Sequence, residues 1–159
     1  MILGITGHTK ELGKHLHDKF SENMFVKGFS RSNGYDIKNP IDREKIIKEA
    51  QDCHVFINLV HNYYHQTDIL FELFQKWENQ EKLIINISTK VLENEEWGLE
   101  KFEYIEYKIQ KQNLENMSKY LNKKSQQPKI FNYRITEINF HKDFINLNTI
   151  INEFKLSKK

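Results

Sequence analysis

Short apolar runs recur along the chain, and each is rich in β-branched and aromatic residues, the composition that strands favour. Between these runs, apolar residues return every three or four positions, the spacing typical of amphipathic helices. The predicted strands lie at 1–6, 25–30, 53–60, 83–87 and 130–135, with one more short strand at 35–37. The predicted helices lie at 11–21, 42–51, 67–79, 99–122 and 146–154.

This alternation predicts an α/β fold. Parallel strands need crossover connections, and the first four predicted helices supply them. The strands are almost continuously apolar, as in a sheet that is covered by helices on both faces. We therefore predict a single domain over residues 1–159, a three-layer αβα arrangement around a doubly wound, mostly parallel, Rossmann-like sheet.

Charge and cysteine content narrow the functional classes. The chain has 24 Lys and Arg against 22 Asp and Glu, so the net charge of +2 gives no general reason to expect a nucleic acid or a membrane surface as partner. Cys53 is the only cysteine, which excludes an internal disulfide and a cysteine-based zinc site and favours a reducing, cytoplasmic location. Glycine and threonine interrupt the apolar start within seven residues, so it predicts a buried strand rather than a signal peptide or membrane span.

The first predicted strand ends in the sequence TGHTKELG at 6–13. In a doubly wound sheet, such a turn directs backbone N–H groups and a helix N-terminus toward a crevice at the carboxyl edge, where a phosphate binds well. Gly7 allows a sharp turn, and Gly13 allows the helix to pack closely against the strand. An ordinary strand-to-helix turn capped by Thr9 is the alternative interpretation.

TGHTKELG resembles the T-G-x-x-x-G-x-G loop of the short-chain dehydrogenase/reductase family, with Glu11 at the position of the middle glycine. Some relatives carry T-G-x-x-x-x-L-G instead. The resemblance covers most of the chain, but only the nucleotide-binding core of the family, and implies a domain that binds a nicotinamide cofactor. The loop residues that it implies as cofactor contacts are Gly7, Thr9, Lys10, Leu12 and Gly13.

The second predicted strand ends in GFSRSNG, which places Ser30, Arg31 and Ser32 beside the first loop. An arginine flanked by serines suits the 2′-phosphate of NADP, whereas NAD favours an acidic residue there. Relatives that prefer NADP often carry basic residues at the positions of Lys10 and Arg31, so the resemblance implies NADP rather than NAD. Two solvated surface charges are the alternative. Further cofactor contacts that the resemblance implies are Asp36, near the adenine, and Asn58 and Leu59, at the end of the third predicted strand.

Proton transfer in the family uses a tyrosine with a lysine four residues later, both on one helix face. In the family, the lysine lowers the tyrosine pKa and holds the nicotinamide ribose. We select Tyr107 and Lys111 because they lie nearest the apolar stripe of the helix at 99–122. A tyrosine buried for packing beside a snorkelling lysine gives the same pattern. The other pairs with this spacing are Tyr104 with Lys108, the alternative register, and Tyr120 with Lys124, at the far end of the helix.

The run LIINISTK ends in Ser88 and Thr89, and the resemblance implies that Thr89, or else Ser88, holds the substrate carbonyl oxygen. A polar strand end is the alternative. Two features depart from the family, because Thr136-Glu137 replaces the usual Pro-Gly and the helix at 67–79 lacks the asparagine that many relatives use in catalysis. Little chain follows the last strand, so we expect no separate substrate-binding lobe.

Histidine and aromatic patterns bear on metals and assembly. His61 and His65 share one helical spacing but have no clear third ligand, so we expect no metal site. Aromatic residues on the helix at 67–79 favour a homodimer through this helix and the one at 99–122, with core packing as the alternative. These aromatic residues are Phe71, Phe74 and Trp77.

The resemblance, together with these patterns, implies an NADP(H)-dependent oxidoreductase similar to short-chain dehydrogenases/reductases. Its expected substrate is a small carbonyl compound or alcohol. The alternative is a non-catalytic NADP-binding sensor or regulatory module with the same fold and ligand. A structural or interaction protein with an empty crevice is a third, more distant class.

Overall fold

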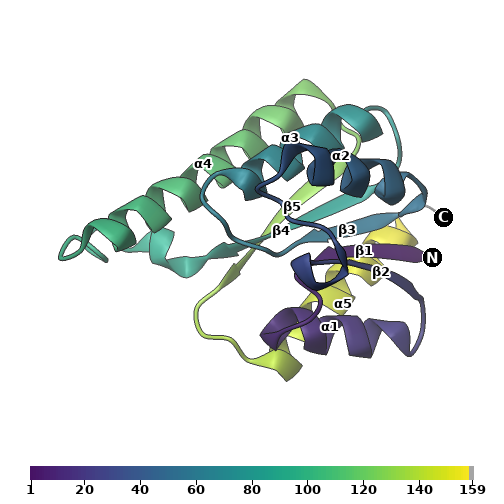
Figure 1. Cartoon of the computed structure of the whole chain (residues 1–159), viewed down its shortest axis with the longest axis horizontal. Helices are drawn as coiled ribbons and strands as arrows, with labels where there is room; N and C mark the ends of the chain where they lie inside the picture. The colour runs from purple at the N-terminus through teal and green to yellow at the C-terminus, as the bar shows by residue number, and fades with distance from the viewer. Residues whose placement is uncertain (158–159) are drawn as a thin grey trace.

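Five strands form one sheet at the centre of the molecule (Figure 1). They are β1 (Ile2–Thr6), β2 (Phe25–Phe29), β3 (Val55–Asn58), β4 (Leu83–Thr89) and β5 (Lys129–Ile135). The computed structural model describes residues 1–157. All neighbouring strands are parallel, in the order β2-β1-β3-β4-β5. The predicted doubly wound parallel sheet is therefore confirmed.

Helices cover both faces of this sheet. They are α1 (Glu11–Ser21), α2 (Pro40–Glu49), α3 (His65–Trp77), α4 (Phe102–Lys124) and α5 (Phe140–Leu156). Figure 1 shows α2, α3 and α4 on one face and α1 and α5 on the other. Each face has its own apolar cluster, and every residue of β3 and β4 is buried. The near-continuous apolar runs are thus explained by a strand that packs against helices on both sides.

The order of the strands reverses between β1 and β3. The chain leaves β1 toward β2 and then returns to the opposite side of β1 to form β3. At such a switch point the loops after the two strands diverge and leave a crevice at the carboxyl edge. This part of the fold therefore positions the predicted site.

The short strand predicted at 35–37 does not form. These residues follow a short 3-10 helix at Arg31–Asn33, and the Asp36 carboxylate accepts a hydrogen bond from Lys38 N over 3.0 Å. This local turn competes with strand pairing, as aspartate side chains often do. The last helix also begins earlier than predicted, because the Asn139 side chain caps its first turn by accepting from Lys142 N.

Two of the three aromatic residues behind the predicted dimer lie in the core. Phe74 and Trp77 on α3 are 1% and 0% exposed, and they pack in the cluster beneath α2, α3 and α4. Phe71 alone keeps a large exposed fraction, 41%. The expectation that Phe74 and Trp77 are available for a dimer contact was wrong, because both side chains are buried in the core of the same chain. The homodimer itself stays a prediction.

No helix within residues 1–157 combines the length and apolar character needed to cross a membrane. The longest described helix, α4, carries charged residues along its whole length.

Candidate functional site

A cavity of about 350 Å³ opens at the carboxyl edge of the sheet, between the start of α1, the ends of β4 and β5 and one side of α4. All four residues predicted to be catalytic line it, and so do several predicted cofactor contacts. The predicted residues on its wall are Lys10, Leu12, Gly13, Leu59, Ser88, Thr89, Tyr107 and Lys111. The structure therefore brings the two halves of the predicted site into one hollow.

The loop after β1 turns sharply at Gly7, whose φ of 74° is a left-handed conformation that glycine adopts without strain. Its amide donates to Phe29 O of β2 over 2.7 Å. A Cβ on Gly13 would lie 2.0 Å from Gly7 O, so only glycine allows α1 to begin so close to this loop. The first N–H groups of α1, which have no partner inside the helix, therefore lie beside the cavity.

Glu11 stands at the position that is glycine in the family loop. Its φ is 46°, and the exposed residue lines the cavity. A carboxylate at a helix N-terminus interacts favourably with the helix dipole, but it also competes with a phosphate for the same N–H groups. The first turn of α1 can therefore accept an anion only where the flexible Glu11 side chain moves aside.

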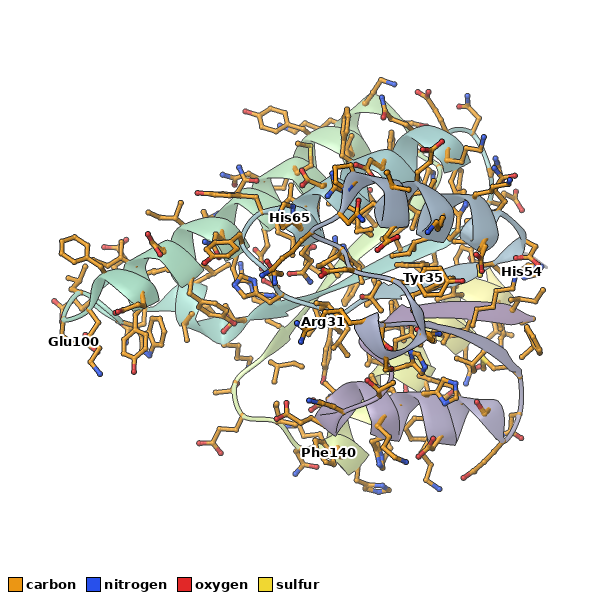
Figure 2. The ribbon with its side chains drawn as sticks, viewed as in Figure 1. Arg31, Tyr35, His54, His65, Glu100 and Phe140 are labelled. Carbon is orange, nitrogen blue, oxygen red and sulfur yellow. The ribbon has the colours of Figure 1, made fainter. Side chains whose placement is uncertain are left out.

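The remaining predicted cofactor contacts lie outside the cavity wall: Gly7, Thr9, Ser30, Arg31, Ser32, Asp36 and Asn58. Figure 2 shows Arg31 on the segment that leaves β2, where the residue is exposed. The bond from Gly7 N to Phe29 O keeps this segment next to the first loop. Ser30 is less available, because its hydroxyl lies 2.8 Å from that of Ser32 and it also bonds Asn33.

Asn58 serves the interior of the sheet. Its side-chain amide donates to Gln66 O over 2.8 Å and to Asn86 Oδ1 over 2.9 Å, and the residue is 1% exposed. The segment that follows is held by Thr6, whose hydroxyl oxygen accepts from Leu59 N over 2.9 Å. Leu59, not Asn58, consequently presents its side chain at the cavity.

Lys111 reaches the cavity wall from α4 and is 3% exposed. Its Nζ donates to Gln66 Oε1 and to Ile87 O, each over 2.8 Å. Burial lowers the pKa of this amine to about 7, although the charge of Glu115 opposes the shift. Near neutral pH the side chain is therefore divided between its charged and neutral forms.

Tyr107 lies on the same wall, with the centre of its ring 5.8 Å from Lys111 Nζ. Burial raises the pKa of its phenol, and the Thr89 side chain opposes that rise. The expectation that the lysine lowers the tyrosine pKa was wrong for this structure. The amine of Lys111 is directed to Gln66 and Ile87, so desolvation controls the phenol instead.

His61 is a residue of this site that the sequence patterns did not select. Its ring meets that of Tyr107 edge to face, with the centres 4.8 Å apart, and it lines the cavity. Burial, followed by the charge of Lys111, lowers the pKa of His61 to about 4, so the ring is neutral at neutral pH. Its position directly after the third apolar run was the available signal, but the search for metal ligands drew attention to its spacing from His65 instead.

The two hydroxyls at the end of β4 have different partners. Ser88 Oγ donates to Glu115 Oε1 over 2.7 Å, and Arg134 clasps the same carboxylate through Nε at 2.9 Å and Nη2 at 2.6 Å. Thr89 Oγ1 accepts from Val91 N over 3.3 Å and so caps the next turn. The Thr89 side chain also hydrogen-bonds Tyr107, whereas the Ser88 hydroxyl is bound to Glu115, so Thr89 is the better placed of the two to meet a substrate oxygen beside the phenol.

The Glu115 carboxylate makes stability depend on pH. Burial raises its pKa, but hydrogen bonds from Arg134 and Ser88 outweigh burial and bring the pKa below its ordinary value of 4.5. A lowered pKa gives stability that is present above the ordinary value and is lost as the pH falls through the folded-state value. We expect Glu115→Gln to lower the free energy of unfolding by ~2 kcal/mol at neutral pH, and by progressively less below about pH 4.

Urea unfolding at several pH values measures this difference. Glu93→Gln is the matched control, because Glu93 bonds the same arginine at the surface, where an ion pair contributes only ~0.5 kcal/mol. A loss for Glu115→Gln that does not change with pH would contradict the ionic role of this carboxylate.

The alternative register lies away from the cavity. Tyr104 packs on Trp97, with ring centres 5.3 Å apart, and Lys108 Nζ donates to the backbone oxygens of Asn94 and Glu95. Neither residue lines the cavity. Tyr107 and Lys111 are therefore the pair that the fold directs to the carboxyl edge.

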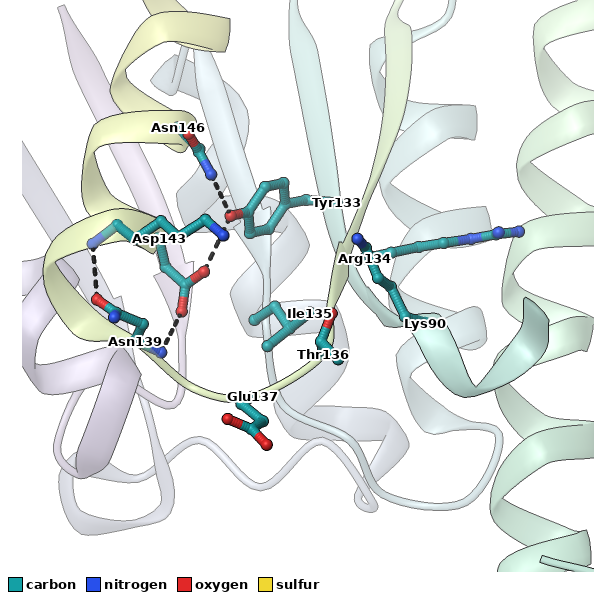
Figure 3. A pocket seen from close by; sticks show the side chains of 10 residues that line it. Lys90, Tyr133, Arg134, Ile135, Thr136, Glu137, Asn139, Asp143 and Asn146 are labelled. Carbon is teal, nitrogen blue, oxygen red and sulfur yellow. Dashed lines mark hydrogen bonds between the residues drawn. The ribbon is translucent and has the colours of Figure 1, made fainter. Parts of the chain in front are cut away.

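A larger cavity, about 450 Å³, lies between the end of β5 and the start of α5 (Figure 3). Tyr133 Oη donates to Asp143 Oδ1 over 2.9 Å, and Asn146 Nδ2 donates to Tyr133 Oη over 2.9 Å. Asp143 also accepts from Asn139 N. These bonds tie α5 to β5, which gives the polar side chains a structural role. Among residues 1–157, this cavity shares Ile135 and Thr136 alone with the site.

Neither the protein-family models nor the curated protein sequences contain a match to this chain. Solved structures do resemble it. A bulky-bulky ketone specific alcohol dehydrogenase from Comamonas testosteroni has a TM-score of 0.74 at 14% identity, over 98% of this chain and 84% of its own. A short chain dehydrogenase from Burkholderia cenocepacia J2315 in complex with NADP has a TM-score of 0.67 at 14% identity, over 85% of this chain and 70% of its own.

A third similar structure is the 3-alpha-hydroxysteroid dehydrogenase from Pseudomonas sp. B-0831 complexed with NADH, with a TM-score of 0.53 at 14% identity. The match covers 76% of this chain and 57% of that protein. At such low identity the likeness shows the fold. The predicted Rossmann-like α/β fold is thereby confirmed, and the chemistry has to be argued from the residues of the cavity.

Proposed function

We propose that this chain is an NADP(H)-dependent oxidoreductase that acts on small carbonyl compounds. The observation that carries the proposal is the single cavity in which the N-terminus of α1 meets Thr89, Tyr107 and Lys111. One part of this wall offers unpaired backbone N–H groups, which suit a phosphate, and the other offers hydroxyls and an amine, which suit proton transfer. Similar structures whose names include NADP or NADH lend support.

The cofactor fits the residues at the start of α1. The close approach of α1 to Gly7, which Gly13 alone permits, places the first turn of the helix beside the cavity, where a diphosphate would bind with the Glu11 side chain moved aside. Lys10, next to this turn, and Arg31, on the neighbouring segment, would hold the 2′-phosphate that distinguishes NADP. When bound, the nicotinamide supplies or accepts the hydride.

Tyr107 and Thr89 act on the substrate oxygen in this proposal. Because burial raises the pKa of Tyr107, the phenol keeps its proton at neutral pH and can give it to a carbonyl oxygen. Thr89 donates a second hydrogen bond to that oxygen. The protonated phenol is the form that reduction of a carbonyl compound requires.

A second candidate function is a non-catalytic NADP-binding sensor or regulatory module. The observation in its favour is the position of the Lys111 amine, which already serves Gln66 and Ile87 and does not lower the pKa of Tyr107. Such a module would bind NADPH with the same residues and show no turnover.

The difference in affinity between NADPH and NADH tests the part of the proposal that concerns the cofactor. We expect Arg31→Ala and Lys10→Ala each to weaken NADPH binding ~10-fold, because each removes a charge-assisted contact worth ~1.5 kcal/mol. NADH binding should change little. Titration of both dinucleotides by calorimetry measures the effect.

Lys14→Ala is the matched control, because this exposed lysine of the same helix pairs with Asp18 and does not line the cavity. Equal affinity of the wild-type protein for NADPH and NADH would contradict the 2′-phosphate clamp. Failure of both dinucleotides to bind would overturn the proposed function.

A further inference from the structure

The Lys111 amine is a buried cation without a counter-charge. Its two hydrogen-bond acceptors, Gln66 Oε1 and Ile87 O, are both uncharged. Among residues 1–157, no carboxylate oxygen lies within 4.0 Å of this amine, whereas surface lysines such as Lys14 pair directly with a carboxylate. A buried amine in such a setting loses its proton readily.

The geometry leaves the neutral form of this amine free to react. A neutral amine has two N–H groups and one lone pair, and the two observed bonds occupy both N–H groups. The lone pair is then available for a bond to carbon. Lys111 lines the 350 Å³ cavity together with Thr89 and Tyr107, and this cavity is the space from which a small molecule would approach the amine.

We propose that Lys111 is a nucleophile that forms an imine with a small aldehyde or ketone bound in this cavity. The lone pair of Nζ attacks the carbonyl carbon while the oxygen receives a proton from the Tyr107 hydroxyl, which then regains one from the nitrogen. The resulting carbinolamine loses water, so that a C=N bond replaces the C=O bond. The sequence consumes no oxidant or reductant and needs no dinucleotide, so it goes beyond the proposed hydride transfer.

Several groups facing Lys111 influence its titration. His61 is neutral near pH 7, and burial keeps Tyr107 protonated there, because its pKa is raised. Glu115, one turn along α4, favours the charged amine. The other charged residues on the cavity wall are Lys10 and Glu11. Burial outweighs these influences, since the pKa of Lys111 is about 7.

Reductive trapping tests the proposal on the full chain without added dinucleotide. The protein is treated with acetone and cyanoborohydride near neutral pH, which converts an imine into a stable isopropyl amine, and is then digested for mass spectrometry. An ordinary lysine with a pKa near 10.4 has only about one free amine in 2,500 at pH 7, whereas about half of Lys111 is free. We expect the Lys111 peptide to carry at least ~10-fold more label than the peptide with exposed Lys119.

Three comparisons decide the outcome. Label on Lys111 should level off above about pH 7. Lys119→Met should retain the Lys111 label, and in urea both positions should react alike. Label on surface lysines with none on Lys111 would overturn the proposal. So would equal label on both peptides of the folded protein.

Lys111→Arg removes the nucleophile and keeps a cation, so it should lose this label. If this variant does not fold, the wild-type peptide map still decides the question, because it assigns the label to a residue. NADPH binding is measured separately, so a negative trapping result would leave the proposed cofactor function intact. Conversely, label on Lys111 without NADPH binding would support imine chemistry alone.

Discussion

Tyr107→Phe should slow the NADPH-dependent reduction of small aldehydes and ketones by ~10²–10⁴-fold, the usual effect of losing a positioned general acid. The phenol lies on the cavity wall beside Thr89 and keeps its proton at neutral pH, because burial raises its pKa. Phenylalanine preserves the ring and its edge-to-face contact with His61, so NADPH affinity should be nearly unchanged. Oxidation of NADPH against a panel of small carbonyl compounds, followed by absorbance, measures the rate.

Tyr104→Phe is the matched control for this variant. Tyr104 belongs to the same helix and to the alternative register, but it packs on Trp97 outside the cavity. Its hydroxyl should therefore matter little to turnover. Full activity of Tyr107→Phe would refute the assignment of the acid, and a wild-type protein that binds NADPH but reduces none of the panel would favour the sensor.

The sheet was predictable because strands that are buried on both faces have an almost continuously apolar sequence. Each residue of β4 is buried, and the corresponding run LIINIS carries almost no charge. The bounds of α1 also agree with the predicted helix at 11–21, since the apolar spacing begins directly after the loop. Local periodicity is sufficient wherever an element meets the core along its whole length.

Features set by distant contacts were not predictable in this way. An aromatic residue at helical spacing can face the core or a partner, and only the packing of α3 beneath its neighbours assigns Trp77 to the core. Similarly, the segment at 35–37 has strand-forming residues, but the Asp36 turn determines its conformation. The spacing of apolar residues identifies the apolar face of a helix, whereas the tertiary fold determines which element packs against that face.

The site shows the same division. Glycine spacing in the first loop pointed to the close approach of α1 and β1, and the structure places Gly13 against Gly7 O. Helical periodicity favoured Tyr107 over Tyr104 as the candidate acid, and of these two residues the structure places Tyr107 on the cavity wall. By contrast, the bond from Lys111 to Gln66 joins residues 45 positions apart, so nothing local in the sequence could reveal that the amine is held away from the phenol.

Gly13→Val is expected to lower the free energy of unfolding by ~3 kcal/mol, at the upper end of the usual cost of overpacking. An added Cβ would lie 2.0 Å from Gly7 O, a backbone atom that cannot rotate away as a side chain could. Either α1 or the loop must therefore move. Because the same movement displaces the first N–H groups of α1, NADPH affinity should fall by more than ~10-fold in any molecules that still fold.

Urea unfolding and NADPH titration of the same preparations separate the two effects. Lys14→Val is the matched control, because it places the same side chain on the exposed surface of the next position in α1. It costs a little helix propensity and the surface pair with Asp18, about 1 kcal/mol together. If Gly13→Val unfolds no more easily than Lys14→Val, the contact between α1 and the first loop does not constrain the fold. In that event the loop is too loose to hold a diphosphate against the helix, and the argument for a dinucleotide loses its structural basis.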